Sequence, residues 1–151
     1  MSNSSNSENG MPIRPPLDGV LETALVVEDV ARAIRFYTGI FGFEVMVQSE
    51  RLGSLNVKPA QVLLLFQRGG SLNYIQLPGG ILPGGMDAQG RSHMAFAIPA
   101  AELEAWRHWL AQNEVAIEST VHWERGGTSL YFRDPDGNLL ELATPGLWAN
   151  Y

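Results

Sequence analysis

The stretch ETALVVEDVARAIRFYTGIFGFEV, residues 22–45, contains a strand, a helix and the start of another strand in close succession. The side chains of residues 20–27 alternate in the pattern that is typical of a half-buried strand. Asp29 suits a helix N-cap, apolar residues recur at helical spacing over residues 30–41, and Gly42 stands where the helix would end. Three more strand-like runs follow, at residues 43–49, 52–57 and 61–67. The segment therefore predicts a βαβββ unit.

The same order of elements begins again at residue 92. HMAFAI predicts a strand, AAELEAWRHWLAQ predicts a helix, and three strand-like runs follow at residues 115–123, 128–133 and 138–144. An offset of 71 residues places Glu22 on His93 and Gly42 on Asn113, and Gly and Asn both tolerate the left-handed conformation at a helix exit. We predict an α+β fold in which paired βαβββ modules form a cupped mixed sheet with helices on the outside. The alternative is one mixed α+β sheet without duplication.

The predicted organisation has five segments. These are a disordered tail (1–17), a first module (18–67), a linker (68–91), a second module (92–145) and a C-terminal tail (146–151). The linker has three Gly-Gly pairs, but it lacks the GK[ST] motif and the strand–turn–helix context of a phosphate loop. We interpret it as a flexible connection, and covering the mouth of a pocket is its functional alternative.

The composition of the chain excludes several classes of function. The 151 residues carry a net charge of −6, which argues against a nucleic-acid binder, and contain no apolar run long enough to cross a membrane. The absence of cysteine excludes disulfides and thiolate chemistry. Residues 1–10 have no apolar stretch and do not form a secretory signal. We expect a cytoplasmic protein that handles a small molecule.

Ionisable residues stand on otherwise apolar strands. Glu22 is followed on its strand face by Ala24 and Val26, and His93 is followed on its face by Ala95 and Ala97. Glu141 shares its face with Leu139 and Ala143. If the apolar faces pack on the helices, Tyr131 and Arg133 join this group around one cavity. Buried carboxylates need a proton, a cationic partner or a metal. Oxygen and imidazole donors suit iron, manganese, nickel or zinc, so Glu22, His93 and Glu141 are candidate metal ligands.

The segments ETALVVEDVARAIRFYTGIFGFEV, SHMAFAI and YFRDPDGNLLEL resemble the vicinal oxygen chelate superfamily, which includes glyoxalase I, extradiol dioxygenases and the fosfomycin and bleomycin resistance proteins. The resemblance covers residues 20–144. It implies metal ligands at Glu22, His93 and Glu141, and a homodimer. Two departures stand out. Position 22 is most often His or Gln in the metal enzymes of the family, and a fourth glyoxalase ligand would fall on Leu64 or Leu65, which leaves only Gln76 of the linker as a substitute.

The resemblance implies two functions. The first is a metal-dependent dioxygenase or glyoxalase-like lyase whose small substrate chelates the metal through two vicinal oxygens. The spacing of Tyr131 and His122 before Glu141 resembles that of extradiol dioxygenases, which makes both catalytic candidates, although a plain loop position is the alternative for His122. Arg133 or Arg125 could pair with an acidic substrate group. The second function is metal-free drug binding of the bleomycin-resistance kind, with tryptophans as stacking surfaces.

Overall fold

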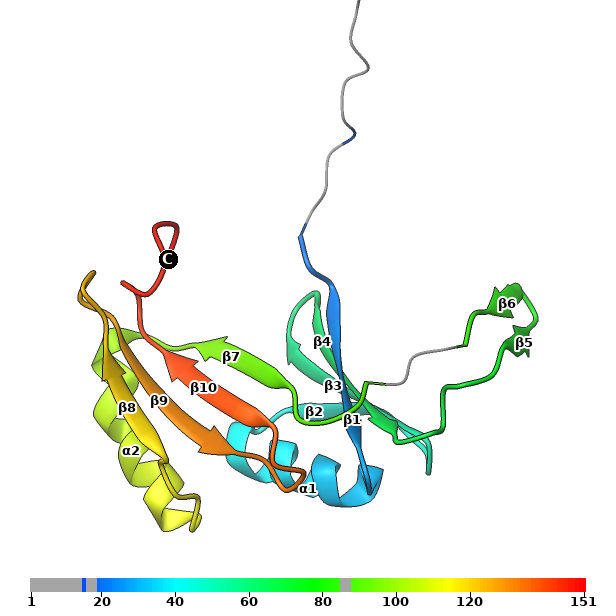
Figure 1. Cartoon of the computed structure of the whole chain (residues 1–151), viewed down its shortest axis with the longest axis horizontal. Helices are drawn as coiled ribbons and strands as arrows, with labels where there is room; N and C mark the ends of the chain where they lie inside the picture. The colour runs from blue at the N-terminus through cyan, green and yellow to red at the C-terminus, as the bar shows by residue number, and fades with distance from the viewer. Residues whose placement is uncertain (1–14, 16–18, 85–87) are drawn as a thin grey trace, which may run out of the picture.

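The computed structural model describes residue 15 and residues 19–84 and 88–151. The first module contains β1 (Glu22–Val27), α1 (Val30–Phe41), β2 (Glu44–Gln48), β3 (Leu52–Lys58) and β4 (Gln61–Gln67). The second contains β7 (His93–Ala97), η1 (Ala100–Glu102), α2 (Leu103–Gln112), β8 (Ser119–His122), β9 (Thr128–Arg133) and β10 (Leu139–Ala143). Their sheets have the equivalent orders β1-β4-β3-β2 and β7-β10-β9-β8, each with one parallel pair. The α+β fold of two βαβββ modules is confirmed (Figure 1).

The first helix begins and ends at the residues that the sequence indicates. Asp29 is its N-cap, and the carboxylate accepts a hydrogen bond from the backbone N–H of Arg32 at 2.9 Å. Gly42 is its C-cap in the left-handed conformation, with φ of 69°. Its N–H donates to the carbonyl of Thr38 at 3.0 Å, which pairs one of the carbonyls left free at the helix end.

The second helix ends at Asn113, as the sequence indicates, but the left-handed conformation expected for this residue was wrong. Asn113 has φ of −94°, and the left-handed residue is Glu114, with φ of 58°. The side-chain amide of Asn113 donates to the carbonyl of Trp109 at 2.9 Å, and so does its backbone N–H at 3.1 Å. Asn113 therefore satisfies the helix end from a near-helical conformation, and the chain reverses one residue later.

Two other segments differ from the sequence-based boundaries. The strand expected over residues 115–123 is regular only over Ser119–His122, because Val115 and Ile117 pack against the core ahead of it. The segment expected to be a flexible linker contains a hairpin, β5 (Ile75–Leu77) and β6 (Gly80–Leu82), which form a separate two-stranded sheet. Apart from residue 15, the predicted N-terminal tail lies outside the described residues.

One hydrophobic core joins the two modules. Phe41, at the end of α1, contacts the rings of Phe96 and Phe132 from the second sheet, with centroid distances of 4.7 and 6.3 Å. The indole N–H of Trp109 in α2 donates to the carbonyl of Ile40 in α1 at 2.8 Å. The helices pack on the apolar faces of the sheets, so the opposite faces stay open. Figure 1 shows the two sheets side by side.

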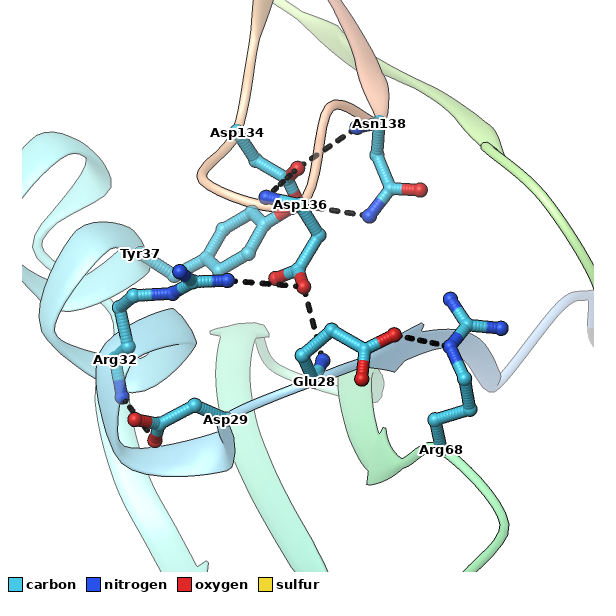
Figure 2. A network of polar contacts seen from close by, with 8 residues as sticks. All are labelled: Glu28, Asp29, Arg32, Tyr37, Arg68, Asp134, Asp136 and Asn138. Carbon is cyan, nitrogen blue, oxygen red and sulfur yellow. Dashed lines mark hydrogen bonds and ion pairs between the residues drawn. The ribbon is translucent and has the colours of Figure 1, made fainter.

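A polar network also ties the modules together (Figure 2). Asp136, in the turn between β9 and β10, accepts hydrogen bonds from the backbone N–H of Glu28 at 2.9 Å and from the guanidinium of Arg32 at 3.2 Å. The hydroxyl of Tyr37 in α1 donates to the carboxylate of Asp134 at 2.8 Å. The β9–β10 turn of the second module is therefore anchored on the β1–α1 junction of the first.

Tyr37→Phe should lower the free energy of unfolding by about 1.5–3 kcal/mol in urea titrations near neutral pH, because it removes a buried hydrogen bond to a charged group. Tyr74→Phe is the matched control. Tyr74 is 74% exposed, so its substitution should change the value by no more than about 0.5 kcal/mol. An equal effect of the two substitutions would contradict this role of Tyr37.

The same pair predicts a dependence on alkaline pH. Burial, together with the charge of Asp134, raises the pKa of Tyr37 above its ordinary value. Above about pH 10 the unfolded chain ionises this phenol while the folded chain keeps it protonated, so wild-type stability falls. Tyr37→Phe lacks this contribution, and its stability should approach that of the wild type as pH rises above 10. A gap that stays constant with pH would contradict the prediction.

Candidate metal centre

His93 and Glu141 meet on the open face of the second sheet. β7 and β10 are parallel neighbours that pair His93 with Leu139, and Glu141 lies two residues further along the same face. The ring Nδ1 of His93 lies 3.0 Å from the carbonyl oxygen of Leu139. A carbonyl only accepts, so we assign the ring proton to Nδ1. Nε2 then faces the carboxylate Oε2 of Glu141 at 3.3 Å.

This geometry calls for a cation. In the neutral ring, Nε2 presents a lone pair to a carboxylate oxygen, and two such donors repel each other unless a proton or a metal ion lies between them. Ligand atoms about 2.0–2.2 Å from a metal, at adjacent coordination positions, lie about 3.0–3.5 Å apart. The observed 3.3 Å fits a shared divalent ion, and the hydrogen bond at Nδ1 is the second-nitrogen contact that metal-binding histidines usually make.

Hydrogen bonds from two hydroxyl groups fix the other carboxylate oxygen of Glu141. Its Oε1 accepts a short hydrogen bond from the hydroxyl of Ser129 and another from the hydroxyl of Tyr131 at 3.0 Å. The indole N–H of Trp123 donates to the Ser129 hydroxyl at 2.8 Å and completes a chain of donors. Glu141 is only 3% exposed, so these contacts compensate for lost hydration. They leave Oε2 as the oxygen directed at His93.

Tyr131 is a protonated donor at this site. Burial, and then the hydrogen bond to Glu141, raise the pKa of its hydroxyl above the ordinary value. The half-exposed ring of His93 lies 6.4 Å from the ring of Tyr131, measured between centroids. On β7 itself, Ala95 and Ala97 are exposed and small. The face beside the pair therefore has room for a ligand and carries a hydroxyl that can donate to it.

The first module does not repeat the pair of a histidine and a carboxylate. Glu22 is exposed at the start of β1 and occupies the position that His93 has in β7. β4 pairs Leu64 with Ala24, just as β10 pairs Glu141 with Ala95. An apolar residue thus stands where the second module has its carboxylate. Within the part of the chain that the structure describes, no three His, Asp or Glu side chains gather closely enough to hold a metal, so Glu22 is not brought to the pair.

Two other candidates lie away from the pair, and a third is engaged elsewhere on the same face. Strand alternation places His122 on the face of Thr120, whose hydroxyl accepts from Arg107 of α2, whereas Glu141 lies on the opposite face. Gln76 bonds within its own hairpin, to the carbonyls of Leu77 and Gly80. Arg133 lies on the face of the pair, as expected, because β9 and β10 pair it with Leu139, but its guanidinium makes a two-point ion pair with Glu118, at 2.8 and 3.0 Å.

Sequence reasoning missed the roles of Ser129 and Trp123. The signal for Ser129 was present, because it lies two residues before Tyr131 and therefore on the same face of β9. Trp123 gave no such signal, since it follows the end of β8 and reaches Ser129 through the turn between β8 and β9.

The sequence profile described as the Glyoxalase/Bleomycin resistance protein/Dioxygenase superfamily matches residues 19–142, which include both modules. The chain belongs to this superfamily. The match spans the paired modules and the His93–Glu141 site, in agreement with the resemblance found in the sequence.

Relatives within the superfamily cover nearly all of the chain. A metallothiol transferase, FosB, from Staphylococcus haemolyticus is 30% identical over 132 residues, which are 87% of this chain and 86% of that protein. The crystal structure of a lactoylglutathione lyase from Agrobacterium tumefaciens has a TM-score of 0.79 and 30% identity, covering 89% of this chain and 99% of that one. The fosfomycin resistance protein FosX from Mesorhizobium loti, with a TM-score of 0.60 and 22% identity, covers 87% of this chain and 96% of that one, and shows the shared fold.

Ser129→Ala should lower the free energy of unfolding by about 1–3 kcal/mol, because it removes a donor from the buried Glu141 and leaves the Trp123 indole N–H unpaired. Ser119→Ala is the matched control, since Ser119 is exposed on the neighbouring strand opposite Tyr131. Urea denaturation compares the two variants. The chain of donors has no structural role if Ser129→Ala is as stable as Ser119→Ala.

Proposed function

We propose that this chain is a divalent-metal-dependent enzyme in which His93 and Glu141 hold the cation. The observation that carries the proposal is the 3.3 Å approach of His93 Nε2 to Glu141 Oε2, with the remaining atoms of both groups already hydrogen-bonded. Two protein ligands leave a divalent ion with one net positive charge. A further carboxylate makes the site neutral, and Glu22 is the candidate for that ligand.

The third ligand comes from a second copy of the chain. Each chain has one open face that bears the pair His93 and Glu141, and another that bears two exposed carboxylates, Glu22 and Glu44. Of these two, Glu22 stands at the strand position that His93 has in the second module. A two-fold pairing that places the first face against the second produces two equal sites, each with three ligands from two chains. This arrangement accounts for a carboxylate that stands apart from the pair within one chain. The functional unit is accordingly a homodimer.

The bound ion supplies Lewis-acid polarisation to a small substrate that presents two vicinal oxygens, and iron, manganese, nickel or zinc all accept this donor set. The residues of the chain do the remaining work. Tyr131 keeps a hydroxyl proton close to Glu141, from where it can stabilise negative charge that develops on the substrate. Ala95 and Ala97 leave space for the substrate beside the ligands.

The superfamily relatives favour transfer or lyase chemistry. FosB is a metallothiol transferase and the Agrobacterium tumefaciens relative is a lactoylglutathione lyase, both at 30% identity. Both names describe reactions of small molecules. No described helix is long and apolar enough to cross a membrane. We assign the chain to this chemistry, with a small-molecule substrate.

Metal analysis of protein purified without chelator tests the proposal. Wild-type protein should contain about one divalent ion per chain, and His93→Ala and Glu141→Ala should lower metal affinity by at least about 100-fold, more than is lost when only an outer hydrogen-bond partner is removed. His122→Ala is the matched control, because it removes an imidazole from the opposite face and should leave metal binding unchanged.

The absence of bound metal would favour the alternative function. Wild-type protein that is free of metal, and whose melting temperature does not change in strong chelator, would make this chain a metal-free binding protein of the drug-resistance kind.

A further inference from the structure

The two helices leave a groove between them on the outer side of the molecule. It is lined by the last residues of α1 and by one face of α2, and its volume of about 430 Å³ is within the range of small-molecule pockets. The helices pack on the apolar faces of the sheets, so the groove lies away from the open face that bears His93 and Glu141. It is therefore distinct from the candidate metal centre.

Aromatic rings form the walls of the groove. Trp109 is 41% exposed, and its indole N–H donates to the carbonyl of Ile40 at 2.8 Å, which fixes the ring between the two helices. The half-buried ring of Trp106 lies 5.9 Å from that of Phe41, measured between centroids. Binding against such walls has a low entropic cost, because the side chains are already ordered.

No side chain fills the space beside Gly39. This residue lies in the last turn of α1, where a glycine costs about 0.5–1 kcal/mol relative to alanine. A Cβ atom at this helical position would meet no neighbouring atom within 4 Å, so close packing does not require the glycine. Ala105 of α2 also lines the groove with a small, exposed side chain. The two positions together keep the groove open.

The groove has a carboxylate that is not neutralised. Of the described residues that line it, Glu102 alone carries a charge, and it shares a face of α2 with Trp106 and Trp109. Its carboxylate does not cap the helix and takes part in none of the ion pairs among the described residues, whereas Glu104 pairs with Arg107 at 3.2 Å. This charge favours a cationic ligand, and the faces of the indole rings also attract positive charge.

We propose that the groove binds a small organic cation, an aromatic or aliphatic molecule with a substituted ammonium group. The charged group lies beside Glu102 and over the face of Trp109, and the apolar part lies in the space between Gly39 and Ala105. An anion would be repelled by Glu102, and a neutral molecule would leave its charge without a partner. The inference goes beyond the proposed function, because binding in this groove requires no metal.

Titration with benzyltrimethylammonium tests the proposal. The NMR signal of the Trp109 indole N–H, which its loss in Trp109→Phe protein assigns, should shift in a saturable way. The dissociation constant should be about 1 mM or lower, as expected for a probe of this size. Benzyl alcohol and phenylacetate have the same ring without a positive charge, and they should bind at least about threefold more weakly.

Two charge-matched substitutions in and beside α2 locate the site. Glu102→Gln removes the carboxylate of the groove and should weaken binding of benzyltrimethylammonium by about two- to fivefold at low salt, as expected for an exposed charge pair. Glu104→Gln is the matched control. It changes the net charge equally, but Glu104 pairs with Arg107 and does not line the groove, so its effect should be less than about 1.5-fold.

A substitution in α1 blocks the groove without weakening the helix. Gly39→Leu places a side chain in the open space and should weaken binding of the probe by at least about tenfold, because the groove no longer holds its apolar part. The melting temperature should equal or exceed that of the wild type, since leucine favours a helix more than glycine does. The lost binding then does not result from unfolding.

Several outcomes overturn the inference. These are the absence of a saturable shift up to about 10 mM probe, equal affinity for phenylacetate, equal effects of the Glu102 and Glu104 substitutions, and unchanged binding in Gly39→Leu protein. A Trp109 signal that shifts with protein concentration in the absence of probe would assign the groove to a second copy of the chain instead.

Discussion

The hydrogen bond between His93 Nδ1 and the carbonyl of Leu139 is the contact on which the site depends. It follows from the parallel pairing of β7 with β10, which puts His93 directly beside Leu139 and brings Glu141 two residues further along the same face. With its proton held at Nδ1, the ring has only Nε2 to offer, and Nε2 faces a carboxylate oxygen. The backbone register thus brings an imidazole nitrogen and a carboxylate oxygen within 3.3 Å of each other, and Ser129, Tyr131 and Trp123 keep the carboxylate in position.

The contacts between modules explain why Glu22 stands apart from His93 and Glu141 within one chain. Tyr37 and Asp134, with Arg32 and Asp136, fix the β9–β10 turn against the first helix, and the shared core places both helices on the apolar faces of the sheets. The open faces consequently do not close on each other within the chain. The proposal of a second copy that brings Glu22 to the pair follows from this separation of the two faces.

Much of the fold, and part of the site, could be predicted from the sequence. Local signals were enough to predict the bounds of the first helix and the sheet face on which His93 and Glu141 lie, because capping and strand alternation depend on near neighbours. The distance between Glu22 and that pair could not be predicted, since it depends on long-range contacts between modules. The sequence analysis interpreted the β5–β6 hairpin as part of a flexible linker, because it relied on the glycines and not on the apolar runs on either side of the turn at residues 78–79.

Subunit complementation tests most directly whether the ligands of each metal ion come from two chains, as proposed. Glu22→Ala and His93→Ala chains, co-expressed with different affinity tags and purified as the mixed dimer, carry both defects in one site and neither in the other. The mixed dimer should recover about one tightly bound ion per pair of chains, while each variant alone should bind metal weakly or not at all. A mixed dimer that binds no more metal than the separate variants would contradict the proposal that each site takes ligands from both chains.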